Sequence, residues 1–296
     1  MKLNVDVITK TKNRPILLKR AIQSVANQSF ENWTHIIIND GGDPAPVEAI
    51  VRELAPNFRS KTKLIHNQVS SGMEAASNLG IRNGTGALVV LLDDDDTWHP
   101  NFLSTCVETL AKAPQLKGVV TRTSRVEERI VGNKIVEFKK FEVLPPLKSV
   151  SLSELVSKNL FTTNAFVYRR TAWEVVGPYR EDLPVLGDWE FNIRFLSHFD
   201  VEVVKLPLAF YHTRPADSGP ASNSVIAQID VFEKVRASLF NEYLRNDLAC
   251  GTIGIGVLAA ICQSASSASV NAKQRGFFER AVSYITRRLS HLSKNG

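Results

Sequence analysis

The sequence predicts an α/β fold built on a mostly parallel, doubly wound sheet. Two apolar runs, Ile36–Ile38 and Leu88–Leu92, support this prediction, because an uninterrupted apolar run fits a strand buried on both faces. Segments with helical spacing separate the predicted strands, and this alternation is typical of parallel sheets flanked by helices. The chain has 296 residues and is 44% hydrophobic, enough for one large domain and a smaller appendage.

The predicted strands and helices alternate from the start of the chain. Leu3–Ile8 is expected to be the first strand, and the polar segment Thr9–Pro15 a loop. In this loop Asn13 is placed to cap the following helix, and Pro15 is tolerated in a first helical turn. Apolar residues then recur at helical spacing at Leu18, Ala21, Ile22 and Val25. Next come a strand at 35–38, a helix at 47–54, a strand at 63–65, a helix at 72–82 and a strand at 88–92.

Shorter elements are predicted after residue 96. They are a helix at 100–111, a strand at 118–124, a charged hairpin at 125–140, a helix at 151–157, a strand at 166–168, helices at 171–176 and 187–198, and strands at 201–208 and 210–211. Residues 214–223 are rich in Pro, Gly and Ser, which indicates a linker. We therefore expect one domain at 1–218 and a helical C-terminal extension at 219–296.

The extension has two unusual stretches after a predicted helix at 225–245. Residues 248–272 carry no charge, but their strongly apolar part, 253–262, is shorter than the roughly 20 residues that a membrane span needs. We expect a buried helix there or one that contacts a second subunit in a homodimer. Residues 273–294 form a basic amphipathic pattern, which leaves two interpretations open: a solvated surface helix, or peripheral contact with the inner face of the cell membrane.

Composition and net charge limit the cellular compartment and the kinds of binding partner that fit this protein. The net charge of +6 permits an anionic partner such as a nucleotide or a membrane surface, and nothing indicates a nucleic acid. The three cysteines are odd in number and lack metal-binding spacing, which fits a reducing cytoplasm. The first residues lack the apolar core of a signal peptide. We therefore expect a cytoplasmic protein.

Four consecutive carboxylates, Asp93–Asp96, follow the apolar run Leu88–Leu92 directly. They would stand at the carboxyl end of a strand, where open α/β sheets bind their ligands. Adjacent carboxylates repel one another, and Mg²⁺ or Mn²⁺ would relieve that repulsion and bridge to a diphosphate. The alternative is a solvated acidic loop without a ligand.

Two further aspartates stand at predicted element ends. Asp40 ends a strand, and the two glycines after it allow a ligand to approach the backbone closely; a turn-forming role is the alternative. Asp188 lies at the predicted start of a helix, where an N-cap role is the alternative to a catalytic one.

Five segments, covering residues 3 to about 215 in order, resemble family 2 glycosyltransferases. They are 5–15, 28–42, 72–81, 93–96 and 187–194. They look like that family's opening strand and loop, its second strand with an Asp-Gly turn, its third helix, its D-x-D metal motif and the segment carrying its catalytic base. The resemblance implies an inverting enzyme with the GT-A fold, which is Rossmann-like.

The resemblance implies a site for a nucleoside diphosphate-sugar, such as a UDP-, GDP- or dTDP-sugar. The nucleotide-binding residues it implies are Thr9, Lys10, Thr11, Lys12, Asn13, Arg14, Asp40, Gly72, Asn78, Asp93 and Asp94. The chain departs from the family at Lys10 and Lys12, where Pro and an aromatic residue are common, and at Ser77, where Arg is frequent. A lysine in this loop is able to reach a phosphate.

The resemblance also implies metal ligands and a diphosphate contact. Asp95 is the expected direct ligand of Mn²⁺ or Mg²⁺, which would neutralise the diphosphate leaving group. The family often places a histidine or basic residue over the diphosphate at the position of Arg214, and His212 stands two residues earlier. His212 as a metal ligand and Arg214 as a charge clamp both remain open.

Asp188 is the general base that the resemblance implies. An inverting transfer needs a carboxylate to take the proton from the acceptor hydroxyl as that oxygen attacks the anomeric carbon. Glu190 is a weaker candidate for the same role, and Trp189 would either stack on an acceptor sugar or pack in the core. The expected acceptor is a glycan or a lipid-linked glycan in bacterial polysaccharide biosynthesis.

Two other functions compete with glycosyl transfer. A nucleotidyltransferase of similar shape would carry a Gly-rich phosphate loop after its first strand, and Thr9–Pro15 contains no glycine. A catalytically inactive relative would hold a nucleotide without turnover, against which the intact Asp95 and Asp188 argue.

Overall fold

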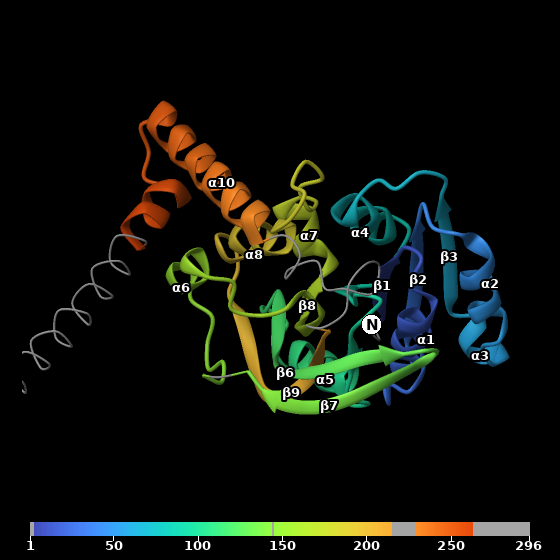
Figure 1. Cartoon of the computed structure of the whole chain (residues 1–296). Helices are drawn as coiled ribbons and strands as arrows, with labels where there is room; N and C mark the ends of the chain where they lie inside the picture. Colours follow the sequence, from blue (N-terminus) through green and yellow to red (C-terminus); the bar gives the residue numbers. More distant parts are fainter. Residues whose placement is uncertain (1–2, 144, 215–228, 263–296) are drawn as a thin grey trace, which may run out of the picture. The chain divides into compact units, whose positions relative to one another are not determined.

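The computed structural model describes residues 3–143, 145–214 and 229–262. The chain divides into two compact units, residues 1–237 and 238–296. The described part of the first unit contains a nine-stranded sheet with helices packed against it (Figure 1). The domain boundary that the sequence predicts after residue 218 falls between residues 214 and 229, outside the described residues.

Four parallel strands form one half of the sheet. They are β1 (Val5–Thr11), β2 (Trp33–Asp40), β3 (Thr62–Asn67) and β4 (Leu88–Leu91), in the spatial order β3-β2-β1-β4. Ile8 pairs with Ile36 on one side and with Leu91 on the other. Because the strands run in the same direction, their carboxyl ends meet at one edge of the sheet. Thr11, Asp40 and the residues after Leu91 therefore lie along that edge.

Helices cover both faces of the parallel half. They are α1 (Pro15–Ala26), α2 (Pro44–Arg52), α3 (Pro56–Arg59) and α4 (Met73–Arg82). Ile37 of β2 belongs to one core cluster with Leu18 of α1 and Val47 of α2. The next residue, Ile38, lies 3.5 Å from where a Cβ on Gly80 of α4 would stand. Since successive strand residues point to opposite faces, α4 lies across the sheet from α1 and α2. The prediction of a doubly wound sheet is confirmed.

The predicted loop at Thr9–Pro15 is wrong in its first part. Residues 9–11 continue β1 and pair with β2, because β-branched threonines suit a strand whose end faces a polar site. The predicted cap at Asn13 is also wrong, since Arg14 occupies the N-cap position of α1. Asn13 has a φ of 56°, and its Oδ1 accepts a hydrogen bond of 2.9 Å from the backbone N–H of Asp43. It thus ties the end of β1 to the start of α2.

The other half of the sheet is mixed. It contains β5 (Thr97–Trp98), β6 (Gly118–Val131), β7 (Lys134–Glu142), β8 (Phe166–Arg169) and β9 (Val201–Thr213). From β4 the order continues β8-β6-β9-β5, and β7 forms the predicted charged hairpin with β6. β8 runs antiparallel to β4 and β6, whereas β6 and β9 are parallel. β9 is one strand instead of the predicted two, and it pairs with the short β5, which the sequence does not predict.

Short helices connect this half. They are α5 (Phe102–Lys112), α6 (Leu152–Ser157), the 3-10 turn η1 (Thr163–Ala165), α7 (Arg170–Val176) and α8 (Gly187–Leu196). Leu186, with a φ of 69°, occupies the N-cap position of α8, so Asp188 stands in the first turn and the N-cap alternative is excluded. Asp188 is thereby available for another role.

The second unit contributes little to the described structure. α10 (Ile229–Cys250) begins in the first unit and ends in the second, close to the predicted helix at 225–245, and residues 255–262 are helical. Within the described ranges no helix combines the length and apolarity needed to cross a bilayer. The basic pattern at 273–294 and nearly all of the predicted linker lie outside the described residues.

We expect Ile37→Ala to lower the free energy of unfolding by about 2–5 kcal/mol, because Ile37 is fully buried and the variant leaves a cavity between β2 and two helices. Urea unfolding measures the change. Val175→Ala, at a site that is 60% exposed, is the control and should stay within about 0.5 kcal/mol of wild type. Equal losses in the two variants would contradict the assigned core.

Candidate active site

The acidic run, Asp93–Asp96, follows β4 and meets polar side chains from the end of β1. Lys10 forms an ion pair with Asp93. Thr11 Oγ1 donates a hydrogen bond of 2.7 Å to Asp94, and Arg14 Nη1 donates one of 2.8 Å to the other oxygen of that carboxylate. Because β1 and β4 are paired neighbours, their ends bring opposite charges together.

Asp95 is held by three arginines. Its Oδ2 accepts from Arg14 Nη2 at 3.3 Å and also from Arg214 Nη2. Its backbone carbonyl accepts a hydrogen bond of 2.6 Å from Arg20. Arg214, at the end of β9, is only 1% exposed, so its guanidinium is an internal counter-ion for Asp95. Of the two alternatives left open by the sequence, Arg214 is the residue that the structure brings to Asp95.

Glu128 of β6 lies between the same arginines. Its carboxylate accepts hydrogen bonds from Arg214 Nη1 at 2.7 Å and from Arg20 Nη2 at 3.1 Å. It also lies 2.7 Å from Nδ1 of His212. Burial alone would raise the pKa of Glu128, but the hydrogen bonds from His212 and Arg20 outweigh it and lower the pKa to about 2. Glu128 is therefore a permanent anion at neutral pH.

His212 is engaged through both ring nitrogens. Nδ1 lies against Glu128, and Nε2 is 2.8 Å from the hydroxyl of Thr97. Burial lowers the pKa of His212, although Glu128 opposes that shift. Its backbone N–H donates to Asp96 at 3.0 Å, and burial raises the pKa of that carboxyl well above its usual value. Both ring nitrogens of His212 thus lie against other residues of the chain, and its role as a metal ligand stays a prediction.

Basic side chains already balance these acids. Among the described residues, four bases pair with four carboxylates: Lys10, Arg14, Arg20 and Arg214 with Asp93, Asp94, Asp95 and Glu128. We call these eight residues the ion-pair network. These pairs relieve part of the repulsion that a divalent cation would relieve, although burial, Asp95 and Asp93 still raise the pKa of Asp96. The residues present do not fit the Mn²⁺ or Mg²⁺ expected on Asp95 and His212.

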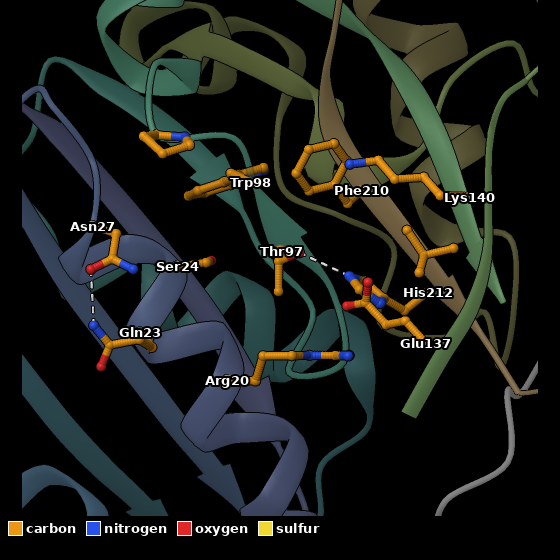
Figure 2. Close-up of a pocket in the computed structure, with 12 residues that line it drawn as sticks. Arg20, Gln23, Ser24, Asn27, Thr97, Trp98, Glu137, Lys140, Phe210 and His212 are labelled. Carbon is orange, nitrogen blue, oxygen red and sulfur yellow. Dashed lines mark hydrogen bonds between the residues drawn. The ribbon is translucent and has the colours of Figure 1, made fainter. Parts of the chain in front are cut away.

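A second group has the composition of a metal site. Glu128, Glu137 and His212 place one ligand atom each within 4.8 Å of one another. Figure 2 shows Glu137 and His212 beside Arg20 in a pocket of about 350 Å³ between α1 and the strands β5, β7 and β9. A dication at this position would be repelled by the two guanidiniums that hold Glu128. We therefore assign Glu128 and His212 to a structural network that also lines this pocket.

Asp40 holds the segment between β3 and α4. Its carboxylate accepts hydrogen bonds from Asn67 at 2.7 Å, from Ser70 at 2.8 Å, and from the backbone N–H groups of Ser71 and Gly72 at 2.9 and 3.0 Å. Burial raises the pKa of Asp40, but these hydrogen bonds outweigh it and lower the pKa to about 2. Its acceptor positions are filled by the chain, which favours the turn-forming role over contact with a nucleotide base.

Two predicted nucleotide-binding residues lie in the interior. Thr9 is fully buried, with its hydroxyl 2.9 Å from His35 Nε2. Asn78 is also fully buried and bonds the backbone of Tyr179 through both its amide oxygen and its nitrogen, at 3.0 and 2.8 Å. Both side chains thus have structural partners within the chain, and their predicted contact with a nucleotide stays a prediction. Lys12 and Asn13 remain exposed beside the end of β1.

Trp189 and Glu190 of α8 are also structural. Trp189 is 3% exposed and donates a hydrogen bond of 2.6 Å to the carbonyl of Leu155, which corresponds to the core alternative. Glu190 is 1% exposed and accepts two hydrogen bonds of 2.7 Å from Arg194. Both oxygens of Glu190 are thus engaged by Arg194, and its weaker candidacy as the base stays a prediction.

Asp188 is half-buried, and the side chains of Thr163 and Asn159, which bind it, are neutral. Its Oδ2 accepts from Thr163 at 3.0 Å and from Asn159 at 3.2 Å. Burial raises the pKa of Asp188, the hydrogen bond from Thr163 opposes this, and the nearby Asp93 raises it further. A carboxylate oriented by neutral donors and with a raised pKa is suited to accept a proton.

Glu74, in the first turn of α4, is a further buried carboxylate near Asp188 and Lys10. No motif in the sequence pointed to it as a functional residue. It is 8% exposed, and a Cβ on Gly187 would lie 2.4 Å from its carboxyl carbon. Burial raises its pKa to about 7, against the influence of Lys10 and with that of Asp188 and Asp93. The sequence does contain a glycine, Gly187, directly before Asp188. Only the structure shows that this glycine leaves room for the Glu74 side chain. Arg20 and Glu128 were likewise missed.

The fold resembles that of solved glycosyltransferases of the GT-A type. S. aureus TarS (residues 1–349, with UDP-GlcNAc) has a TM-score of 0.60 at 15% identity, covering 79% of this chain and 65% of that one. The mannosyltransferase PcManGT of Pyrobaculum calidifontis, with GDP-Man and Mn²⁺, has a TM-score of 0.56 at 15% identity, covering 91% and 81%. At this identity the likeness concerns the fold.

The sequence comparison specifies the family. The profile described as "Glycosyl transferase family 2" matches residues 6–176, more than half of the chain, and the protein belongs to this family. A PGL/p-HBAD biosynthesis glycosyltransferase of Mycobacterium bovis is 27% identical over 193 residues, which are 65% of this chain and 70% of that protein. The fold and family expected from the sequence are confirmed, and the protein is a glycosyltransferase.

We expect Glu74→Gln to remove a pH dependence of stability. With the pKa raised from 4.5 to about 7, the folded state binds more protons than the unfolded state in this window, so wild-type stability falls as the pH rises through it. Relative to wild type, the variant should gain up to about 3 kcal/mol between pH 5 and pH 8. Urea unfolding at both pH values, with exposed Glu108→Gln as the control, measures this. A pH-independent difference would contradict it.

Proposed function

We propose that this protein transfers a sugar from a nucleoside diphosphate-sugar to a hydroxyl group, with inversion at the anomeric carbon. The observation that carries the proposal is the convergence of Asp188 with the strand-end residues Lys10 and Asp93. Lys10 is ion-paired with Asp93, and burial together with the nearby Asp93 raises the pKa of Asp188, although the three residues come from β1, the segment after β4 and α8. A charged donor site near a carboxylate base is what such a transfer requires.

In the proposed reaction the acceptor oxygen attacks the anomeric carbon from the side opposite the diphosphate. The new carbon–oxygen bond forms as the bond to the diphosphate breaks, and the diphosphate leaves with the electron pair. Asp188 accepts the proton of the acceptor hydroxyl through its carboxylate. Thr163 and Asn159 orient this carboxylate through the oxygen they bind. If a divalent cation takes part, it would supply further charge neutralisation to the diphosphate.

The acceptor is proposed from relatives and from the sequence. The relative named for PGL/p-HBAD biosynthesis supports a glycan or lipid-linked glycan as acceptor. A cytoplasmic enzyme with peripheral membrane contact through residues 273–294, acting as a homodimer or alone, is consistent with this proposal. Co-sedimentation with anionic vesicles before and after truncation at residue 270 tests the membrane contact, and unchanged partitioning would rule it out.

The function is tested by transfer from UDP-, GDP- and dTDP-sugars to sugar acceptors in the presence of Mn²⁺, with the anomeric configuration of the product read by NMR. Product of inverted configuration supports the proposal. Retention of configuration would remove Asp188 from the role of base. Binding of a nucleoside diphosphate without transfer to any acceptor, lipid-linked ones included, would instead favour an inactive relative.

We expect Asp188→Asn to lower the transfer rate by about 10²–10⁴-fold, because an amide accepts no proton from the acceptor. Binding of the nucleoside diphosphate, measured by calorimetry, should change little. The acid limb of the pH–rate profile should also vanish, since the raised pKa of Asp188 sets that limb in the wild type. Asp182→Asn, at an exposed carboxylate, is the matched control. Full activity in the Asp188 variant would reject the assignment.

A further inference from the structure

We propose that Lys10 and Arg14 bind the donor diphosphate directly, and that donor binding needs no divalent cation because Arg214 occupies the metal's place beside Asp95. This inference rests on the proposed function and concerns the same site. It departs from the expectation of a cation on Asp95. The inference is argued from the ion-pair network. The partners and the burial of its arginines and its lysine limit where a further positive charge can bind.

The position of Arg214 is fixed from two sides. One guanidinium nitrogen binds Asp95 and the other binds Glu128 at 2.7 Å, and the side chain is fully buried. A dication that approaches Asp95 therefore meets a guanidinium that cannot turn away into solvent. Withdrawing Arg214 would leave Glu128 with one fewer partner in the interior, where an uncompensated charge is costly.

Arg14 adds a second positive charge to the same oxygen. Its Nη2 lies 3.3 Å from Asp95 Oδ2, and its Nη1 lies 2.8 Å from Asp94. Burial opposes the charge on Arg14, but Asp94 and Asp95 outweigh it and raise the pKa of the guanidinium. A cation bound through Asp95 would thus lie close to two permanent positive charges. The carboxylate that the sequence marks as the metal ligand is the one most fully neutralised by arginine.

Lys10 and Arg14 differ from Arg214 in being reachable. Their side chains are 17% and 21% exposed, whereas that of Arg214 is 0% exposed. Both stand where β1 ends and α1 begins, at the edge where parallel strands bind their ligands. Guanidinium and ammonium groups are established partners of phosphate oxygens, and arginine binds them through two nitrogens. Access and chemistry together select these two residues.

When a diphosphate binds, Lys10 and Arg14 share with it the N–H groups that they otherwise donate to aspartates. In the absence of ligand, Lys10 pairs with Asp93 and Arg14 with Asp94. A diphosphate that enters beside them shares the same N–H donors, so the cations are positioned before the ligand arrives. As the bond to the anomeric carbon breaks, the electron pair stays on the diphosphate, and these fixed cations meet the added charge. Arg214, which Glu128 holds in place, stays on Asp95 throughout, and neither Arg214 nor Glu128 contacts the ligand.

Calorimetric titration of the full chain with UDP, GDP and dTDP, in Mn²⁺ and in EDTA, tests the inference. For the tightest-binding nucleotide, we expect the two Kd values to agree within about threefold. Loss of tenfold or more in EDTA, roughly 1.4 kcal/mol or above, would overturn it. Transfer assays in Mn²⁺ test the proposed function separately. Nucleotide binding that requires Mn²⁺, with transfer intact, refutes this inference alone, and chelator-resistant binding without transfer refutes the function alone.

Variants of Lys10 and Arg14 test whether these two residues bind the diphosphate. Lys10→Met and Arg14→Lys should each weaken diphosphate binding by about tenfold or more, and leave binding of the corresponding nucleoside, which lacks phosphate, unchanged. Lys19→Met, on α1 with a side chain that is 64% exposed, is the matched control. Equal weakening of nucleotide and nucleoside would mean that Lys10 and Arg14 only support the fold, and would overturn their assignment.

The Arg214→Gln variant should show the opposite behaviour to wild type, because its nucleotide binding should depend on a divalent cation. Removal of the guanidinium exposes Asp95 to a cation, so nucleotide binding in this variant should become stronger in Mn²⁺ than in EDTA by about tenfold. A merely structural role of Arg214 would not create such a dependence. Thermal unfolding establishes whether the variant is folded. If it is not, the wild-type comparison in EDTA decides the inference.

Discussion

The neutralisation of charge at one edge of the sheet is the constraint on which this structure depends. Parallel strands end side by side, and β4 ends in four carboxylates. Buried like charges are tolerable only with partners, and residues from four other elements take part in this pairing. Lys10 comes from β1, Arg20 from α1 and Arg214 from the end of β9, while Glu128 of β6 joins the last two. Since removal of one partner from a buried pair leaves an unpaired charge, these elements depend on one another.

The mixed half of the sheet serves this network. β6 and β9 are long parallel neighbours, and their pairing sets Val126 opposite His212 and Glu127 opposite Thr213. Glu128 and Arg214, the next residue on each strand, are thereby brought together. The short β5 pairs with β9 directly after the acidic run and fixes Thr97 against His212. Antiparallel β8 joins this arrangement to the parallel half, so the balance of charge among these side chains follows from strand register.

Periodicity predicted the elements well, because apolar spacing depends on burial that is common to the whole fold. Prediction from periodicity failed for segments whose polar side chains face the candidate site. The end of β1 looked like a loop because Thr9–Thr11 is polar, although those residues are paired in a strand. Glu128 lies in a charged hairpin that reads as solvated, and its partner Arg214 is distant in sequence. Asn78 fits a family motif, yet its amide is consumed by Tyr179. Such partnerships arise from tertiary register, which one sequence does not display.

The carboxylates of the site separate into two groups by environment, and this separation indicates their roles. Asp40 and Glu128 accept several hydrogen bonds, which lower their pKa values to about 2 and make them permanent anions that hold loops and arginines. Burial raises the pKa values of Asp188 and Glu74 instead, and fewer donors oppose it. Burial also raises the pKa values of two strand-end carboxylates, that of Asp94 to about 6 and that of Asp96 well above its usual value. Asp40 and Glu128 therefore supply fixed negative charge, whereas the buried carboxylates with raised pKa values, Asp188 among them, are those suited to take up a proton.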